Sequence, residues 1–139
     1  MFRIQGIDHV VLRARQPNKL ITFYRDVLGC VVEREVSQVG LTQLRAGSSL
    51  IDIIQATGGA DPAANDPLAK RERNLDHFCL RVTPFDLAQL DEHFARFDVE
   101  IRKVEQVYGA EGFGPAVYLQ DPEGNTVELK GPATNNADA

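Results

Sequence analysis

The sequence predicts an α+β fold made of two tandem modules, each with the element order strand, helix, strand, strand, strand (βαβββ). The first reason is a repeated motif, because Asp-His-x-x-Leu-Arg stands at residues 8–13 and again at residues 76–81. The second is a pair of apolar segments, each interrupted by one carboxylate, at residues 50–53 and 126–129. The third is the stretch 57–74, whose Gly, Ala, Pro, Asp and Asn content is typical of a linker.

The chain has 139 residues, which suits one ordinary domain. Modules of about 70 residues are marginal alone, so we expect the two to share one core. The second module is longer, because its carboxylate follows that of the first by 76 residues (128 − 52) and its histidine by 68 (77 − 9). We place the extra residues in the Gly-rich stretch 107–115, expected to be a lid-like loop beside the cleft. The expected organisation is a single domain at 1–139, with module one at 5–56, the linker at 57–74, module two at 75–131 and a frayed tail at 132–139.

The first module begins with a strand at residues 7–13, whose β-branched residues favour extended backbone. Alternation along this strand places His9 and Arg13 on the same face. A helix is expected at residues 17–28, because Pro stands near its start, apolar residues recur at helical spacing, and Gly29 suits the left-handed C-terminal position. Three strands should follow, at 30–36, 40–45 and 49–55.

The second module repeats this order. A strand is expected at residues 76–82 and a helix at 85–97, which has apolar residues along one side. Asp-Pro-Glu-Gly-Asn at residues 121–125 indicates a tight turn, because Pro fixes one φ angle and Gly permits a positive one. The remaining strands are expected at 99–106, 116–120 and 126–130.

Composition narrows the classes of partner. The net charge is −5 and no long basic run occurs, which argues against nucleic acid and anionic membranes. No apolar run approaches the roughly 20 residues that cross a bilayer, and the N-terminal residues lack the form of a secretion signal. The two cysteines, Cys30 and Cys79, are too few for a disulfide framework. We therefore expect a cytoplasmic protein that acts on a small molecule.

Each module supplies one histidine early and one carboxylate late. These residues are His9, Asp52, His77 and Glu128. Imidazole and carboxylate together suit a divalent ion such as Zn, Ni, Fe, Mn or Co, with positions left for water or substrate. A lone histidine on a strand is more often a surface or core residue, but its recurrence in the repeat favours a metal site. Cys79 shares the strand face of His77, and a small buried hydrophobe is a better interpretation of it than a nucleophile.

Other residues are candidates for substrate binding. Arg13 and Arg81 stand four residues after the histidines on the same strand faces, where they suit either an anionic substrate or a salt bridge across the module boundary. Tyr108 is a candidate for an aromatic groove, together with Phe113 and Tyr118. His93 has no counterpart in the repeat, and a solvated helix position is the better interpretation.

The combined motifs resemble the vicinal oxygen chelate superfamily, which includes glyoxalase I, bleomycin resistance proteins, fosfomycin transferases, methylmalonyl-CoA epimerase and extradiol dioxygenases. The motifs are the paired Asp-His-x-x-Leu-Arg segments, Phe-Tyr-x-x-Val-Leu-Gly at 23–29, and Asp-Pro-Glu-Gly-Asn-x-x-Glu-Leu at 121–129. The resemblance spans roughly residues 5–131. It implies sheets that curl around a metal cleft, and a ligand set of His9, Asp52, His77 and Glu128 in which Asp52 replaces the usual Glu.

The resemblance also implies the activity. The leading expectation is a metal-dependent lyase or isomerase of glyoxalase I type, whose substrate chelates the metal through adjacent oxygens. Glu128 would be the leading base and Asp52 its symmetric partner. Arg13 matches a glutathione-contacting arginine, but Ala56 stands where a glutathione-contacting asparagine is usual, so the use of glutathione stays open.

Two alternatives remain. One is an extradiol dioxygenase or a fosfomycin-type thiol transferase that uses His9, His77 and Glu128 as its three ligands. The other is a drug- or metabolite-binding resistance protein without catalysis. The superfamily often forms homodimers, and the sequence leaves open whether the two histidines meet within one chain or across two.

Overall fold

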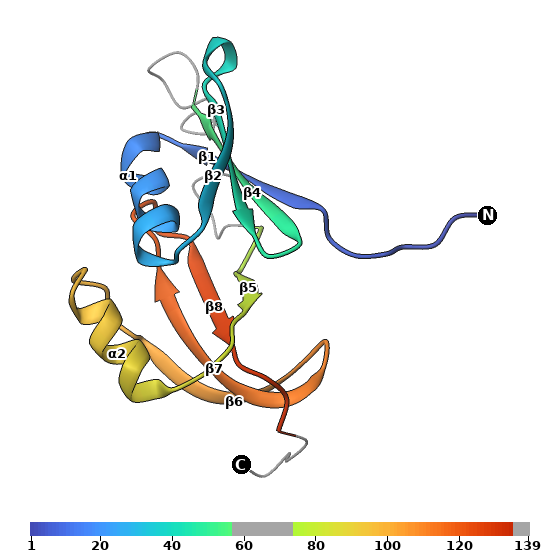
Figure 1. Ribbon diagram of the computed structural model, residues 1–139, viewed down its shortest axis with the longest axis vertical. Helices are drawn as coiled ribbons and strands as arrows, with labels where there is room; N and C mark the ends of the chain where they lie inside the picture. Colours follow the sequence, from blue (N-terminus) through green and yellow to red (C-terminus); the bar gives the residue numbers. More distant parts are fainter. Residues whose placement is uncertain (57–73, 135–139) are drawn as a thin grey trace. The chain divides into compact units, whose positions relative to one another are not determined.

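A computed structural model describes residues 1–56 and 74–134 (Figure 1). Except for its last residue, the predicted linker at 57–74 lies outside the described residues, as does the part of the predicted tail from 135 onward. The chain divides into two compact units, Met1–Arg73 and Asn74–Ala139.

The first unit contains the expected strand, helix and three further strands. Its elements are β1 (His9–Ala14), α1 (Pro17–Thr22), the π-helical turn η1 (Phe23–Val27), β2 (Val31–Val36), the 3₁₀ turn η2 (Ser37–Val39), β3 (Leu41–Ala46) and β4 (Ser49–Gln55). The four strands form one sheet in the order β1-β4-β3-β2, in which β1 and β4 are parallel and the other pairs antiparallel (Figure 1).

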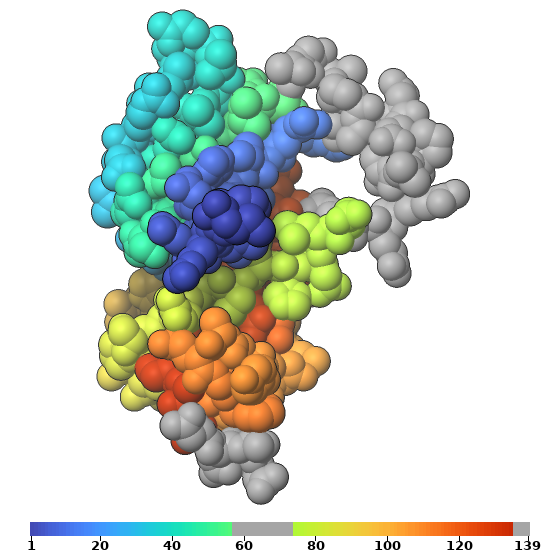
Figure 2. All heavy atoms as spheres, turned by 90° about the vertical axis from the view of Figure 1, so that its right-hand side faces the viewer, coloured from blue at the N-terminus to red at the C-terminus, as the bar shows by residue number. Residues whose placement is uncertain are grey.

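The core of the first unit lies on one face of this sheet. The helical segment α1–η1 buries Leu20, Phe23 and Tyr24, each at most 4% exposed. The buried apolar strand residues are Leu12, Ala14, Leu44, Ile51 and Ile53. The residues before β1 are exposed, and the space-filling view shows them in dark blue on the side that faces the viewer (Figure 2).

The second unit has the same topology. Its elements are β5 (Phe78–Arg81), α2 (Leu87–Ala95), β6 (Lys103–Gly109), β7 (Gly112–Gln120) and β8 (Thr126–Lys130). The sheet order is β5-β8-β7-β6, with β5 parallel to β8. Two open, four-stranded mixed sheets with few helices confirm the predicted α+β class of two βαβββ modules.

The expectation of a lid-like loop at 107–115 is wrong, because these residues belong to a β-hairpin. Strands β6 and β7 pair as far as Gly109 and Gly112. The glycines that indicated a loop instead make room for Lys130, which is only 4% exposed. A Cβ atom at Gly109 would lie 2.9 Å from Cδ and Cε of Lys130, and one at Gly114 would lie 3.1 Å from its Nζ. The extra residues of the second module therefore lengthen the β6–β7 hairpin.

Several other boundaries differ from the expectation, and β6, for example, begins at Lys103 instead of residue 99. Strand β5 begins at Phe78, so His77 lies immediately before the strand. Helix α2 begins later than predicted because Asp86 caps it, accepting a hydrogen bond of 3.1 Å from the backbone N–H of Gln89. Among the described residues, no helix combines the length and apolar character that crossing a membrane requires.

Candidate functional site

In the first unit, strand pairing places His9 and Asp52 on one face of the sheet. The parallel register of β1 and β4 pairs Val11 with Asp52, and His9 stands two residues before Val11. The neighbours of Asp52 on its own strand, Ile51 and Ile53, point to the opposite face and are at most 1% exposed. The fold thus brings an imidazole and a carboxylate to the same side of one sheet.

Asp52 is buried, with 4% of the residue exposed. Its Oδ2 accepts a hydrogen bond of 3.1 Å from Nε2 of Gln43 on the adjacent strand β3. Its Oδ1 is buried and has no hydrogen-bond partner within the described part of the chain. A buried oxygen without a partner is costly, and such atoms in native proteins call for an explanation such as a bound ion.

His9 is oriented by the residue before it. Nδ1 of His9 lies 2.7 Å from Oδ1 of Asp8, and because a carboxylate only accepts, the imidazole must donate from Nδ1. This hydrogen bond is the main cause of a raised pKa for His9, and the charge of Asp52 adds to it. A carboxylate on Nδ1 directs Nε2 toward a metal, as in the second coordination shell of many metal sites.

The second unit repeats this arrangement, and here the histidine also contacts the carboxylate directly. Nδ1 of His77 lies 2.6 Å from Oδ2 of Asp76, and Nε2 lies 3.0 Å from Oε2 of Glu128. Glu128 is 6% exposed on the central strand β8. The hydrogen bond with Asp76 is the main cause of a raised pKa for His77, and Glu128 contributes through its charge and its hydrogen bond. The imidazole and the carboxylate are therefore within reach of one ion.

Two side chains flank Glu128 in the sheet register, Cys79 on β5 and Tyr118 on β7. Desolvation, followed by the Glu128 charge, raises the pKa of Cys79 to about 11 and that of Tyr118 to about 12. Both groups therefore stay protonated near neutral pH. The ring of Tyr118 also meets that of His77 edge to face, with centroids 5.7 Å apart.

The expectation for Cys79 needs one correction. The residue is exposed, where a small buried hydrophobe was expected, because it lies on the edge strand β5 of the second sheet. Neighbouring atoms nevertheless desolvate its thiol enough to raise the pKa. A thiol that stays protonated is a weak nucleophile, which agrees with the interpretation that Cys79 does not act as one.

The side chains of the two imidazole–carboxylate pairs are chemically suited to bind a divalent ion. Each unit offers one imidazole and one carboxylate, a donor set that suits first-row metals. The orphan Oδ1 of Asp52 is the kind of atom that a cation satisfies. Across 1–56 and 74–134, however, no three His, Cys, Asp or Glu side chains gather in one metal-binding group.

The predicted substrate-binding residues have different placements. Arg13 shares the strand face of His9. Nη1 of Arg81 lies 3.4 Å from Oε1 of Glu111, so this ion pair forms within the second unit. Tyr108 is 73% exposed and its ring packs against that of Phe113, at a centroid distance of 5.0 Å. The register places Tyr108 on the face of the sheet opposite Glu128.

Three residues at these pairs were not singled out from the sequence: Asp8, Gln43 and Asp76. The two aspartates were visible in the repeat, because each precedes a histidine. Gln43 carried no signal, since its contact with Asp52 depends on the register of β3 and β4. Tyr118 was only a candidate for an aromatic groove with Tyr108, and the register places it beside Glu128.

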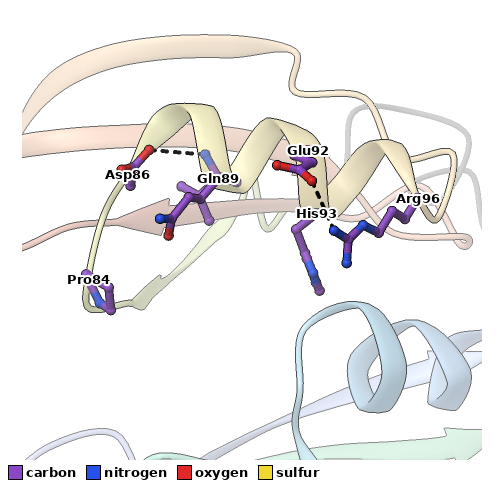
Figure 3. A pocket seen from close by; sticks show the side chains of 7 residues that line it. Pro84, Asp86, Gln89, Glu92, His93 and Arg96 are labelled. Carbon is purple, nitrogen blue, oxygen red and sulfur yellow. Dashed lines mark hydrogen bonds and ion pairs between the residues drawn. The ribbon is translucent and has the colours of Figure 1, made fainter.

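A pocket of about 390 Å³ lies along α2 and includes none of these residues (Figure 3). Several of its polar side chains are engaged within the helix: Asp86 caps the N-terminus, and Glu92 pairs with Arg96 at 3.0 Å. His93 is half-buried instead of solvated, with its ring 5.4 Å from that of Phe94. The pocket residues are Pro84, Asp86, Gln89, Leu90, Glu92, His93 and Arg96.

Solved structures of other proteins share the fold. An integron cassette protein of V. cholerae is 25% identical with a TM-score of 0.72, over 94% of this chain and 98% of that one. A lactoylglutathione lyase of Agrobacterium tumefaciens is 18% identical with a TM-score of 0.66, over 93% of this chain and 95% of that one. A fosfomycin resistance protein of Listeria monocytogenes is 16% identical with a TM-score of 0.68, over 92% of this chain and 91% of that one.

A family model agrees with these likenesses. The model of the Glyoxalase/Bleomycin resistance protein/Dioxygenase superfamily matches residues 6–129, which include both histidines and both carboxylates of the repeat. The chain therefore belongs to the Glyoxalase/Bleomycin resistance protein/Dioxygenase superfamily.

Proposed function

We propose that this protein is a divalent-metal-dependent enzyme of glyoxalase type, a lyase or isomerase that acts on a small metabolite with adjacent oxygen atoms. The observation that carries the proposal is the repeated imidazole–carboxylate pair, His9 with Asp52 and His77 with Glu128. In both pairs a preceding aspartate engages Nδ1, so Nε2 is the ring nitrogen for a metal, which at His77 would take the place of the hydrogen bond with Glu128. A bound divalent ion would polarise the substrate oxygens as a Lewis acid.

The two carboxylates differ in a way that suggests different roles. Asp52 is short, buried and held at Oδ2 by Gln43, so a single oxygen is left for a ligand. We assign it to metal binding. Glu128 is one methylene longer and contacts the imidazole of His77 through Oε2. We assign it as the base that removes a proton from a carbon bearing one of the two oxygens and returns it to the neighbouring carbon.

The surroundings of Glu128 support this assignment. The protonated thiol of Cys79 and phenol of Tyr118 keep like charges away from the carboxylate at neutral pH. The proposal includes a reducing, cytoplasmic location, which the free cysteines Cys30 and Cys79 support, and a homodimer, the common assembly of the superfamily.

The two roles are separable by experiment. Glu128→Gln should lower kcat for a hemithioacetal or hydroxyketone substrate by about 100-fold or more, because the amide cannot accept the proton. Asp52→Asn should mainly weaken metal binding, and saturating metal should restore much of its turnover. The assays are steady-state kinetics at several metal concentrations and metal titration of each variant. If Glu128→Gln turned over as fast as wild type at saturating metal, the proposed mechanism would be wrong.

A further inference from the structure

A row of four paired residues crosses the first sheet, one from each strand. The register pairs Val11 with Asp52, Asp52 with Gln43, and Gln43 with Arg34. The last three are joined by hydrogen bonds: Nη1 of Arg34 donates to Oε1 of Gln43 at 3.1 Å, and Nε2 of Gln43 donates to Oδ2 of Asp52 at 3.1 Å. The carboxylate is thus linked through an amide to a guanidinium on the edge strand.

The chemistry of the three groups fixes the direction of this chain of hydrogen bonds. A guanidinium only donates, so Arg34 must meet the amide oxygen of Gln43. The amide NH₂ group then faces Asp52, whose ionised carboxylate only accepts. Gln43 is therefore held in one of its two amide orientations, with its donor toward the carboxylate. One oxygen of Asp52 is satisfied, and the buried Oδ1 is left without a partner among residues 1–56 and 74–134.

The matching row of the second sheet is built differently. There Cys79 pairs with Glu128, Glu128 with Tyr118, and Tyr118 with Lys103. Instead of a side-chain amide, Glu128 meets His77, at 3.0 Å. The longer Glu reaches its histidine, whereas the shorter Asp is reached by the long side chain of Gln43.

We infer that Gln43 is the positioning residue of Asp52: anchored by Arg34, its amide occupies Oδ2 and so presents Oδ1 alone to a divalent cation. This inference rests on the proposed function, since it takes a metal ion as the ligand of Asp52. Asp52 then binds through one oxygen. A partner of this kind outside the ligand set commonly changes metal affinity by about 10- to 100-fold when it is removed.

The test is a titration of the full-length protein with Co²⁺ and with Zn²⁺ alone, read by calorimetry and, for Co²⁺, by its absorption spectrum. Gln43→Leu removes both hydrogen bonds at similar size, and Gln43→Asn keeps the amide but shortens its reach. We expect the metal Kd to rise by about tenfold in Gln43→Leu and to change in the same direction in Gln43→Asn. Gln38→Leu, the same change at an exposed position in η2, is the matched control and should bind as wild type.

Arg34→Ala tests the anchor. It should weaken metal binding in the wild-type background and have no further effect in Gln43→Leu, because the guanidinium acts only through the amide. Urea unfolding of each apo protein separates loss of affinity from loss of fold, and Gln43→Asn serves if Gln43→Leu does not fold.

The outcomes separate this inference from the proposed function. Wild-type binding with a weakened, folded Gln43 variant and an unaffected Gln38→Leu supports the inference. Wild-type binding with both Gln43 variants unchanged overturns it and leaves the proposed metal site standing. Failure of the wild type to bind either ion overturns the metal site and this inference together.

Discussion

Asp8 and Asp76 show how a single residue can orient the candidate metal-binding histidine that follows it. Both are highly exposed, with side chains 91% and 95% accessible, yet each holds the Nδ1 atom of the following histidine, at 2.7 and 2.6 Å. The hydrogen bond in each case is the largest cause of the raised histidine pKa. In an exposed setting such a bond contributes little to stability, so its main effect is on the orientation and protonation of the imidazole.

Asp76→Ala should therefore lower the pKa of His77 toward its ordinary value of 6.5. A histidine pKa raised in the folded state stabilises the fold below the unfolded pKa, and this stabilisation is lost as pH rises through the folded pKa. The variant should lose that low-pH stabilisation and leave stability at pH values well above the folded pKa nearly unchanged. NMR titration of the apo protein measures the pKa, with Asp8→Ala as control, which should shift His9 only. An unshifted His77 would show that Asp76 does not set its protonation.

Among the elements, the β6–β7 hairpin is where close packing replaces the expected loop. A Cβ atom at Gly114 would lie 2.7 Å from the backbone oxygen of Pro132, which cannot move aside easily. One at Gly109 would meet Cδ and Cε of Lys130 at 2.9 Å, and these belong to a flexible side chain. The two glycines thus differ in what a methyl group would displace.

Gly114→Ala should consequently lower the free energy of unfolding by about 1–3 kcal/mol, as overpacking does, and Gly109→Ala by less. Urea unfolding measures both. Gly6→Ala is the control, because a Cβ there meets nothing within 4 Å. Equal losses at residues 109 and 114 would contradict the packing described for this hairpin.

The elements could be predicted to different degrees for physical reasons. Strands β4 and β8 match the expected ranges, since each is a run of apolar residues bounded by turn residues. The helix expected at 17–28 is observed as α1 followed by the π-helical turn η1. The apolar spacing that predicted this helix does not distinguish an α-helix from a π-helical turn. The hairpin was missed because glycine permits a loop and equally a close approach, and only the position of Lys130 decides between them.

For the whole molecule, the internal repeat is the feature that made the candidate site predictable from the sequence. It identified His9, Asp52, His77 and Glu128, because duplication places equivalent residues at equivalent points of two sheets. It did not identify Gln43, whose role depends on strand register and on one hydrogen bond to Asp52. Periodicity gives the face of a strand on which a side chain lies, and the register decides its neighbours.

The proposed function depends above all on the binding of a divalent metal. Elemental analysis of untagged protein, purified without chelator, tests this binding when it is repeated on His77→Ala and on the matched control His93→Ala. We predict near-stoichiometric metal in the wild type and in His93→Ala, and its loss in His77→Ala. A wild-type protein that holds no metal and takes up none on titration would contradict the proposed function and favour a metabolite-binding protein without metal chemistry.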